Sequence, residues 1–184
     1  MEFSRTSLPK WPAAGAMSDA EGSTRVLAII SSQPLSVGEI ESFVLTDHDG
    51  ALVTFRGIVR NHDHGQGVTG LDYEAHPEAQ RFLEEACSTI AAETGLRVAA
   101  AHRTGALAIG DDALIASVAS AHRAEAFAAC ERLVEVIKAT VPIWKRQHLT
   151  GVRVTAGAAG SDGTGGAGAG AGATDVATTE WVGL

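Results

Sequence analysis

The sequence lacks the features that identify several common classes of protein. No apolar run reaches the ~18 residues that a membrane-spanning helix needs, and the N-terminus has no apolar centre like that of a secretory signal. The GxGxxG spacing at 65–70 and at 163–168 does not open an expected helix, and no P-loop motif is present, so folds that bind nucleotide cofactors receive little support and we expect no cofactor. A membrane protein and a nucleotide-dependent enzyme are therefore both disfavoured.

Cysteine and lysine are also scarce. Cys87 and Cys130 lie in segments with helical periodicity and have no CxxC partner, which favours buried thiols over a disulfide or a metal site. This usage is typical of a reducing cytoplasm, where we expect the protein. Lysine occurs only at Lys10, Lys138 and Lys145, so the last two stand out in the C-terminal half.

The charge balance is acidic. The 184 residues contain 14 Lys and Arg against 22 Asp and Glu, which gives a net charge of −8 at pH 7. Nucleic acid and anionic membranes both require a broadly positive face, so we expect neither as a partner. Any local gathering of positive charge must then be interpreted as a specific site.

Composition divides the chain into four parts. Residues 1–24 contain prolines and glycines without a period and are predicted to be a disordered leader. Residues 25–150 are predicted to form one folded domain, and residues 151–178, rich in Gly and Ala, a flexible linker. Residues 179–184 become apolar again, which predicts a tail able to dock on the domain through Trp181.

Within the predicted domain, helical and strand periodicities alternate irregularly. Helices are expected from the capping pair Ser36 and Glu39 to about Leu45, after Pro77 as far as Gly95, and from Ser120 to about Ala139. Strands are expected at 25–30, 51–60, 68–74, 96–101 and 113–119, with 51–60 and 68–74 paired as a long hairpin. This pattern predicts the α+β class, with an antiparallel sheet and two main helices.

The segment 120–146 gathers several basic groups. Ser120 is the expected N-cap of its helix, and one buried stripe is predicted for Phe127, Cys130, Leu133, Val134 and Ile137. His122 and Arg123 fall in the first turn, where a cation is unfavourable by ~0.3–1 kcal/mol unless an anion offsets it. Free N–H groups, an imidazole and a guanidinium therefore predict an anion site, with phosphate as the expected anion.

The strand expected at 51–60 ends at a second cationic position. Alternation places Arg56 and Arg60 on one face of this strand. The polar loop 61–67 contains His62 and His64, but a third metal ligand is missing, so we expect no metal site. Its glycines instead predict a loop that closes over a site next to Arg60. A metal-dependent hydrolase that uses these histidines with His102 or His122 is the weakest interpretation, because the sequence lacks a set of histidine and carboxylate ligands at a known spacing.

Several spaced motifs together resemble one known family. They are GALVTFRGIVRN at 50–61, HRTG at 102–105, SAHRAEAF at 120–127 and KATVPIWK at 138–145. Collinear within residues 25–150, they resemble the large, catalytic subunit of molybdopterin synthase. The resemblance implies an α/β hammerhead-type two-layer domain and a homodimer of large subunits within a heterotetramer.

The same resemblance implies a sulfurtransferase of molybdenum cofactor biosynthesis. A small ubiquitin-like sulfur carrier would insert its C-terminal Gly-Gly thiocarboxylate into a pocket of the large subunit. Sulfur would then pass twice to cyclic pyranopterin monophosphate, forming the dithiolene of molybdopterin. Carrier tail and precursor are both anions, so an acidic protein needs a concentrated cationic pocket to hold them.

By resemblance, Lys138 and Lys145 are the catalytic residues beside the thiocarboxylate, while Arg60, His122 and Arg123 bind the pterin and its phosphate. A lysine there can stabilise developing negative charge or donate a proton, and the sequence leaves both roles open. Arg56 lies outside this set and is interpreted as a surface residue. The motif at 102–105 is interpreted as structural support of a turn.

Two departures from the family pattern keep a second hypothesis open. Gln147 stands where many relatives have Glu, and Glu180 precedes Trp181 where an Arg is common. A non-catalytic paralogue, which binds the carrier without turnover, would tolerate both changes. Retention of all five cationic residues favours the enzyme, because a simple docking protein has no need of a phosphate site.

Overall fold

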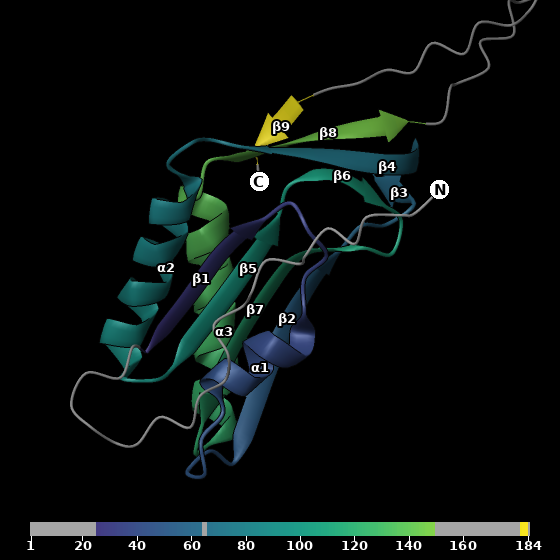
Figure 1. The fold of residues 1–184 in the computed structure, drawn as a ribbon. Coiled ribbons are helices and arrows are strands. Elements are labelled where there is room, and N and C mark those ends of the chain that lie inside the picture. The colour runs from purple at the N-terminus through teal and green to yellow at the C-terminus, as the bar shows by residue number, and fades with distance from the viewer. Residues whose placement is uncertain (1–24, 64–65, 150–180, 184) are drawn as a thin grey trace, which may run out of the picture.

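The computed structural model describes residues 25–63, 66–149 and 181–183, which form three helices and nine strands in two sheets. The helices lie against the first sheet, and the second sheet crosses its end (Figure 1). This mixed, mostly antiparallel architecture confirms the predicted α+β class. Besides the two main helices, the structure contains the short helix that was expected after Ser36.

The first sheet has the strand order β1-β5-β7-β2. Strand β1 (Val26–Ser31) runs parallel to β5 (Val98–Arg103), and β5 pairs antiparallel with β7 (Asp112–Ser120). Strand β2 (Ala51–Ile58) lies at the other edge, antiparallel to β7. The central strands β5 and β7 are almost continuously buried, so they need cover on both faces.

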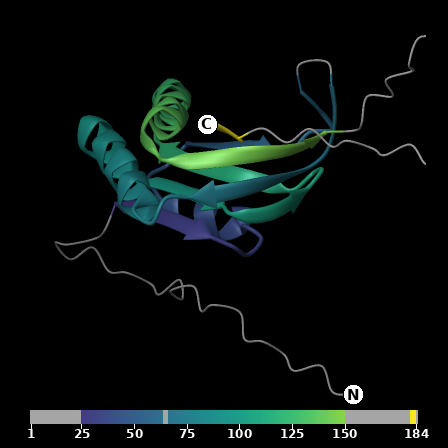
Figure 2. The same ribbon diagram turned by 90° about the horizontal axis from the view of Figure 1, so that it is seen from above.

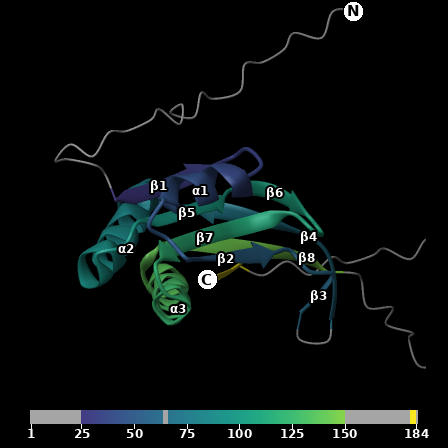
Figure 3. The same cartoon turned by 90° about the horizontal axis from the view of Figure 1, so that it is seen from below.

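Helices provide that cover. Helices α2 (Ala79–Thr94) and α3 (Arg123–Thr140) pack side by side on one face, and α1 (Val37–Val44) packs on the other (Figures 2 and 3). Alternate residues of the central strands divide accordingly. Val98, Ala100, Ala116 and Val118 join the core under α2 and α3, while Ala99, Ala101, Ile115 and Ala119 join the core under α1. The thiols of Cys87 and Cys130 are buried in the first of these cores, as predicted.

Two helix ends follow their sequence signals and a third does not. The Ser36 side chain accepts a hydrogen bond from the backbone N–H of Glu39, and Gly95 closes α2 in the left-handed conformation with φ 74°. The predicted Ser120 cap is wrong, because β7 continues through Ser120 and α3 begins at Arg123. The Ser120 hydroxyl instead donates to the Glu125 carboxylate over 2.6 Å.

The predicted apolar stripe of α3 is wrong at one position. Four of its members, Cys130, Leu133, Val134 and Ile137, are buried, but the side chain of Phe127 is 63% exposed. The face toward the sheet begins with Ala126 and Ala129, which are both buried. Residue 127 therefore falls outside that face, and its ring points into solvent in the single chain.

The second sheet holds the strands β3 (His62–Asp63), β4 (Gln66–Ala75), β8 (Ile143–Leu149) and β9 (Trp181–Gly183) in that order. Strand β6 (Gly105–Ala108) also pairs with β4. A small apolar cluster joins the two sheets, formed by Val59, Val68, Leu71, Leu107 and Ala113. The space between the sheets is therefore packed around the residues that follow β2.

The hairpin predicted between 51–60 and 68–74 is wrong. Strand β2 pairs with β7, while β4 pairs with β6 and β8. An irregularity at Gly57 and Ile58 ends β2 before the predicted Arg60, so Arg56 and Arg60 no longer share one strand face. The chain leaves the first sheet at this bulge and enters the second.

The predicted leader and linker, residues 1–24 and 151–178, lie outside the described residues. Beyond them, β9 pairs with β8, with Trp181 opposite Arg146 and Val182 opposite Lys145. Docking through the Trp181 side chain stays a prediction. Among the described residues, no helix is both long and apolar enough to cross a membrane.

Candidate functional site

A small cavity opens between the end of β2 and the second sheet. Its volume is about 110 Å³, and its apolar lining includes Val59, Val68 and Leu71. Polar side chains complete the wall, among them Arg60, Asp63, Tyr73, Lys145 and Gln147. Two of the predicted site residues, Arg60 and Lys145, therefore meet in one cavity.

Strand β8 brings two polar groups to the cavity through its alternation. Ile143 is buried in the main core, and Lys145 and Gln147 follow on the same strand face. In the register with β4, Lys145 lies opposite Tyr73. Burial raises the pKa of the Tyr73 phenol, so its hydroxyl stays protonated at neutral pH and can donate within the cavity.

Asp63 lies at the centre of the polar wall. Its Oδ1 accepts a hydrogen bond from Arg60 Nη2 at 2.8 Å, and its Oδ2 lies 3.5 Å from Lys145 Nζ. Gln147 Nε2 donates to the same Oδ2 over 2.5 Å. The side chains of Asp63 and Lys145 are 10% and 27% exposed, whereas Arg60 is 67% exposed. A carboxylate thus bridges the two cations of the predicted site.

The opposite face of the second sheet carries a separate ionic cluster. Asp72 Oδ2 accepts hydrogen bonds from Arg146 Nη2 at 2.7 Å and from His148 Nε2 at 2.8 Å. The hydrogen bond from Arg146 is the main cause that holds the pKa of Asp72 below its usual value. Neither basic residue lines the cavity, since Arg146 and His148 alternate with Lys145 and Gln147 along β8.

The remaining predicted site residues lie at the two ends of α3. Lys138 is exposed in the last turn, and the chain passes from there through Val141 into β8. His122 is the N-cap residue and Arg123 begins the helix; both are exposed. The offset of fifteen residues from Arg123 to Lys138 corresponds to roughly 22 Å at ~1.5 Å per residue. One chain therefore brings Lys138 toward the Lys145 strand but leaves His122 and Arg123 at the far end.

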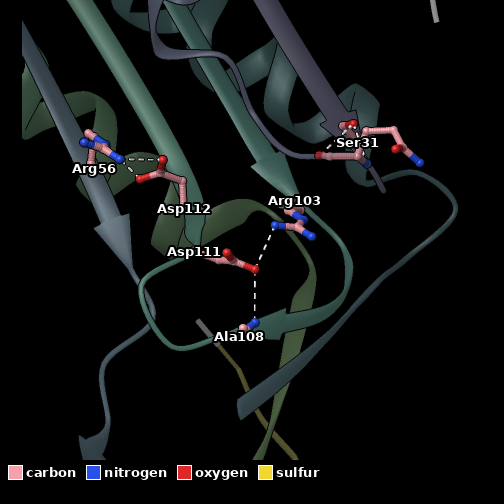
Figure 4. A network of polar contacts seen from close by, with 7 residues as sticks. Ser31, Arg56, Arg103, Ala108, Asp111 and Asp112 are labelled. Carbon is pink, nitrogen blue, oxygen red and sulfur yellow. Dashed lines mark hydrogen bonds and ion pairs between the residues drawn. The ribbon is translucent and has the colours of Figure 1, made fainter. Parts of the chain in front are cut away.

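Two other arginines have structural partners outside the cavity. Arg103 Nη1 donates to Asp111 Oδ2 at 3.0 Å, and the same oxygen accepts from the backbone N–H of Ala108 (Figure 4). Arg56 forms two hydrogen bonds with Asp112, also visible in Figure 4. The contact between Arg103 and Asp111 closes the turn between β6 and β7. This agrees with the interpretation that the motif at 102–105 supports a turn.

The described histidines at 62, 102 and 122 have different surroundings. His62 Nδ1 contacts Asn61 Oδ1 at 2.8 Å, and His122 is exposed at the start of α3. His102 is buried against Tyr73, and burial lowers its pKa to about 4. The structure does not describe His64. No group of three or more His, Cys, Asp or Glu residues within 25–63, 66–149 and 181–183 is arranged to hold a metal ion.

Sequence reasoning missed Asp63 and Tyr73 as site residues. Asp63 was assigned to an irregular loop, yet it forms a short strand whose register with β4 places it opposite Gln66. Its only sequence signal is the polar run that follows Arg60. Tyr73 is the one tyrosine of the chain, and its position in the alternating run of β4 predicts a face but no function.

Comparisons with known proteins bear on this arrangement. A family model described as "MoaE protein" matches residues 30–140, which is more than half of the chain. The chain belongs to the MoaE family. The match includes Arg60, His122, Arg123 and Lys138, and it ends five residues before Lys145.

Similar MoaE proteins include molybdopterin synthase catalytic subunit 1 of Mycobacterium tuberculosis, 43% identical over 122 residues, covering 64% of this chain and 82% of the relative. The molybdopterin synthase catalytic subunit of Escherichia coli is 38% identical over 125 residues, covering 65% and 81%. Among solved structures, molybdopterin synthase from Staphylococcus aureus has a TM-score of 0.65 at 28% identity, covering 88% of this chain and 98% of that chain. Sequence and fold thus lead to the same family.

Proposed function

We propose that this MoaE protein is the catalytic subunit of a molybdopterin synthase. It transfers sulfur from the thiocarboxylate of a small sulfur-carrier subunit to cyclic pyranopterin monophosphate, which forms the dithiolene of molybdopterin. The observation that carries this proposal is the meeting of Arg60 and Lys145 in one cavity of an otherwise acidic chain. Relatives named as catalytic subunits of molybdopterin synthase support it.

The cavity suits the end of an extended chain better than a whole pterin. Its volume of about 110 Å³ lies below the ~300–1,000 Å³ that is usual for a pocket enclosing a small molecule. A Gly-Gly tail has no side chains and can enter such a space with its thiocarboxylate beside Lys145. The ammonium group would then neutralise the tail and stabilise charge that develops during transfer.

The phosphate-bearing precursor needs more room and more positive charge than this cavity offers. His122 and Arg123 provide a helix N-terminus with a guanidinium, a combination suited to phosphate, but they lie far from Lys145 in the same chain. A homodimer would resolve this separation if the start of α3 of one subunit faced the cavity of the other. Exposed apolar side chains on β2 and α3, namely Phe55, Ile58 and Phe127, offer surface for such a contact.

Reconstitution with a cognate carrier tests the proposal. The full chain is co-expressed with a candidate small subunit, the complex is purified, and the carrier is supplied as its thiocarboxylate with the precursor. We expect a stable complex and a product whose formation depends on both substrates. A missing complex together with missing product would overturn the assignment, and normal carrier binding without product would instead favour the non-catalytic paralogue.

A further inference from the structure

The carboxylate of Asp63 occupies an unusual position for an acidic group. It lies 10% exposed inside a cavity whose proposed ligands are anions, and both of its oxygens are engaged. Arg60 contacts Oδ1, while Lys145 and Gln147 approach Oδ2. An acidic group here partly opposes the binding of an anionic ligand, so its presence requires a reason.

The backbone places Asp63 there with little freedom. In the hairpin, Asp63 lies opposite Gln66, and the N–H of Val68 donates to the carbonyl of Asn61 over 2.8 Å. Strand β4 is in turn paired along its length with β8, which carries Lys145. Asp63 is therefore fixed relative to the lysine by two sets of strand hydrogen bonds.

Stability alone does not account for this residue. Removing a carboxylate from water costs several kcal/mol, and buried ion pairs commonly recover no more than that cost. Here one cation, Arg60, is mostly exposed, and the other, Lys145, lies at 3.5 Å rather than at a short contact distance. The contacts instead restrain side chains that would otherwise be mobile, since a lysine has four rotatable bonds and a compact charge.

We propose that Asp63 is the positioning residue of this site, which holds the Lys145 ammonium toward the cavity while Gln147 fixes the carboxylate from the other side. This role rests on the proposed function, because it presupposes that Lys145 serves sulfur transfer. With Asp63 ionised, the two cations and one carboxylate leave a charge of +1. The cavity thus keeps an attraction for one anionic group.

The contact between Gln147 and Asp63 provides a specific test because its direction can be reversed. In Asp63→Asn the charge beside Lys145 disappears. In Gln147→Glu two carboxylates face each other at hydrogen-bond distance and repel. The double variant D63N/Q147E moves the charge across the same contact, so that the amide of residue 63 donates to the carboxylate of residue 147, and Lys145 regains an acidic neighbour.

The experiment measures single-turnover sulfur transfer and carrier affinity for the wild type, both single variants and the double variant, each in the full complex. We expect each single variant to lower the transfer rate by about tenfold, the scale of coupling between contacting charges, with carrier affinity nearly unchanged. The double variant should recover to within about threefold of wild type. Asp72→Asn, which removes an ion-paired carboxylate from the opposite face of the same sheet, is the matched control and should transfer sulfur normally.

The outcomes separate the two proposals. Wild-type protein that transfers no sulfur contradicts the proposed function, and the role of Asp63 is then overturned with it. An active wild type matched by an equally active Asp63→Asn overturns the positioning role alone. Failure of the double variant to recover, with melting temperatures equal to wild type, also overturns it, because a charge restored beside Lys145 should then restore the rate.

Discussion

The Lys145 cavity and the start of α3 hold the same kind of charge in opposite settings. In the cavity, Lys145 is largely buried and shares the carboxylate of Asp63 with Arg60. At the start of α3, His122 and Arg123 are exposed, and the N-cap side chain makes no capping hydrogen bond. One cation set is therefore organised within the chain, whereas the other lies exposed, as its proposed role in binding a phosphate from outside the chain requires.

The largest effect is expected at the lysines. Lys138→Ala should lower single-turnover sulfur transfer by about 100-fold or more, because in the proposed role it removes a charge that stabilises the reacting group. Carrier affinity should change little, since it depends on a wider interface. Lys138→Arg should remain severely impaired, because a broad guanidinium replaces a compact, titratable ammonium.

Arg132→Ala serves as the control for the lysine variants, since Arg132 is an exposed cation on the same helix. It should transfer sulfur at the wild-type rate. Single-turnover rates check the expected loss of sulfur transfer, and titrations with the carrier check that its affinity is unchanged. A Lys138→Ala protein with near-normal transfer would remove this lysine from the catalytic set.

A smaller and different effect is expected at Arg60. Arg60→Ala should raise the precursor concentration needed for half-maximal rate by about tenfold, which is the low end of the ~1.5–3 kcal/mol expected for a charge-assisted contact with phosphate, because Arg60 is mostly exposed. High precursor concentration should partly restore the rate. Arg56→Ala is the matched control, since Arg56 is ion-paired with Asp112 outside the cavity. Equal behaviour of the two variants in initial-rate titrations would contradict the assignment of Arg60.

The smallest effect is expected on the opposite face of the second sheet. The folded state lowers the pKa of Asp72, so its contribution to stability is present above the unfolded-state value of ~3.9 and is lost as pH falls through the folded-state value. Asp72→Asn should therefore lower the melting temperature by about 2 °C at pH 7, and this difference should vanish in strong acid. Thermal melts of the wild type and of Asp72→Asn between neutral and acidic pH check that the difference in melting temperature falls as the pH falls.

The sequence predicted the positions of helices and strands better than it predicted which strands pair. Ser36 and Gly95 marked helix ends because their capping contacts lie within four residues, whereas the same kind of signal failed at Ser120, where β7 continues. The partner of β4 depends instead on the bulge at Gly57 and Ile58, which directs the chain into a second sheet. Alternation within a strand carries no information on that choice, so the expected hairpin was wrong.

The candidate site likewise contains residues that local motifs predicted and residues that only the strand pairing brings there. The motifs around Arg60 and Lys145 resembled one family, and the structure places both residues in one cavity. Asp63 was missed because its place in the cavity arises from the register of β3 with β4 and of β4 with β8, which brings it to a strand far along the chain. Phe127 was assigned to the core because spacing alone does not show that Ala126 and Ala129 face the sheet.

Mixed dimers test most directly whether the two cation sets form one site. Lys145→Ala and Arg123→Ala chains are mixed, allowed to exchange subunits with the carrier present, and assayed for sulfur transfer at low precursor concentration. If each site takes Lys145 from one subunit and Arg123 from the other, random pairing leaves roughly a quarter of the sites intact, so the mixture should clearly exceed both parents. A mixture no more active than the average of its parents would contradict a site shared between two copies.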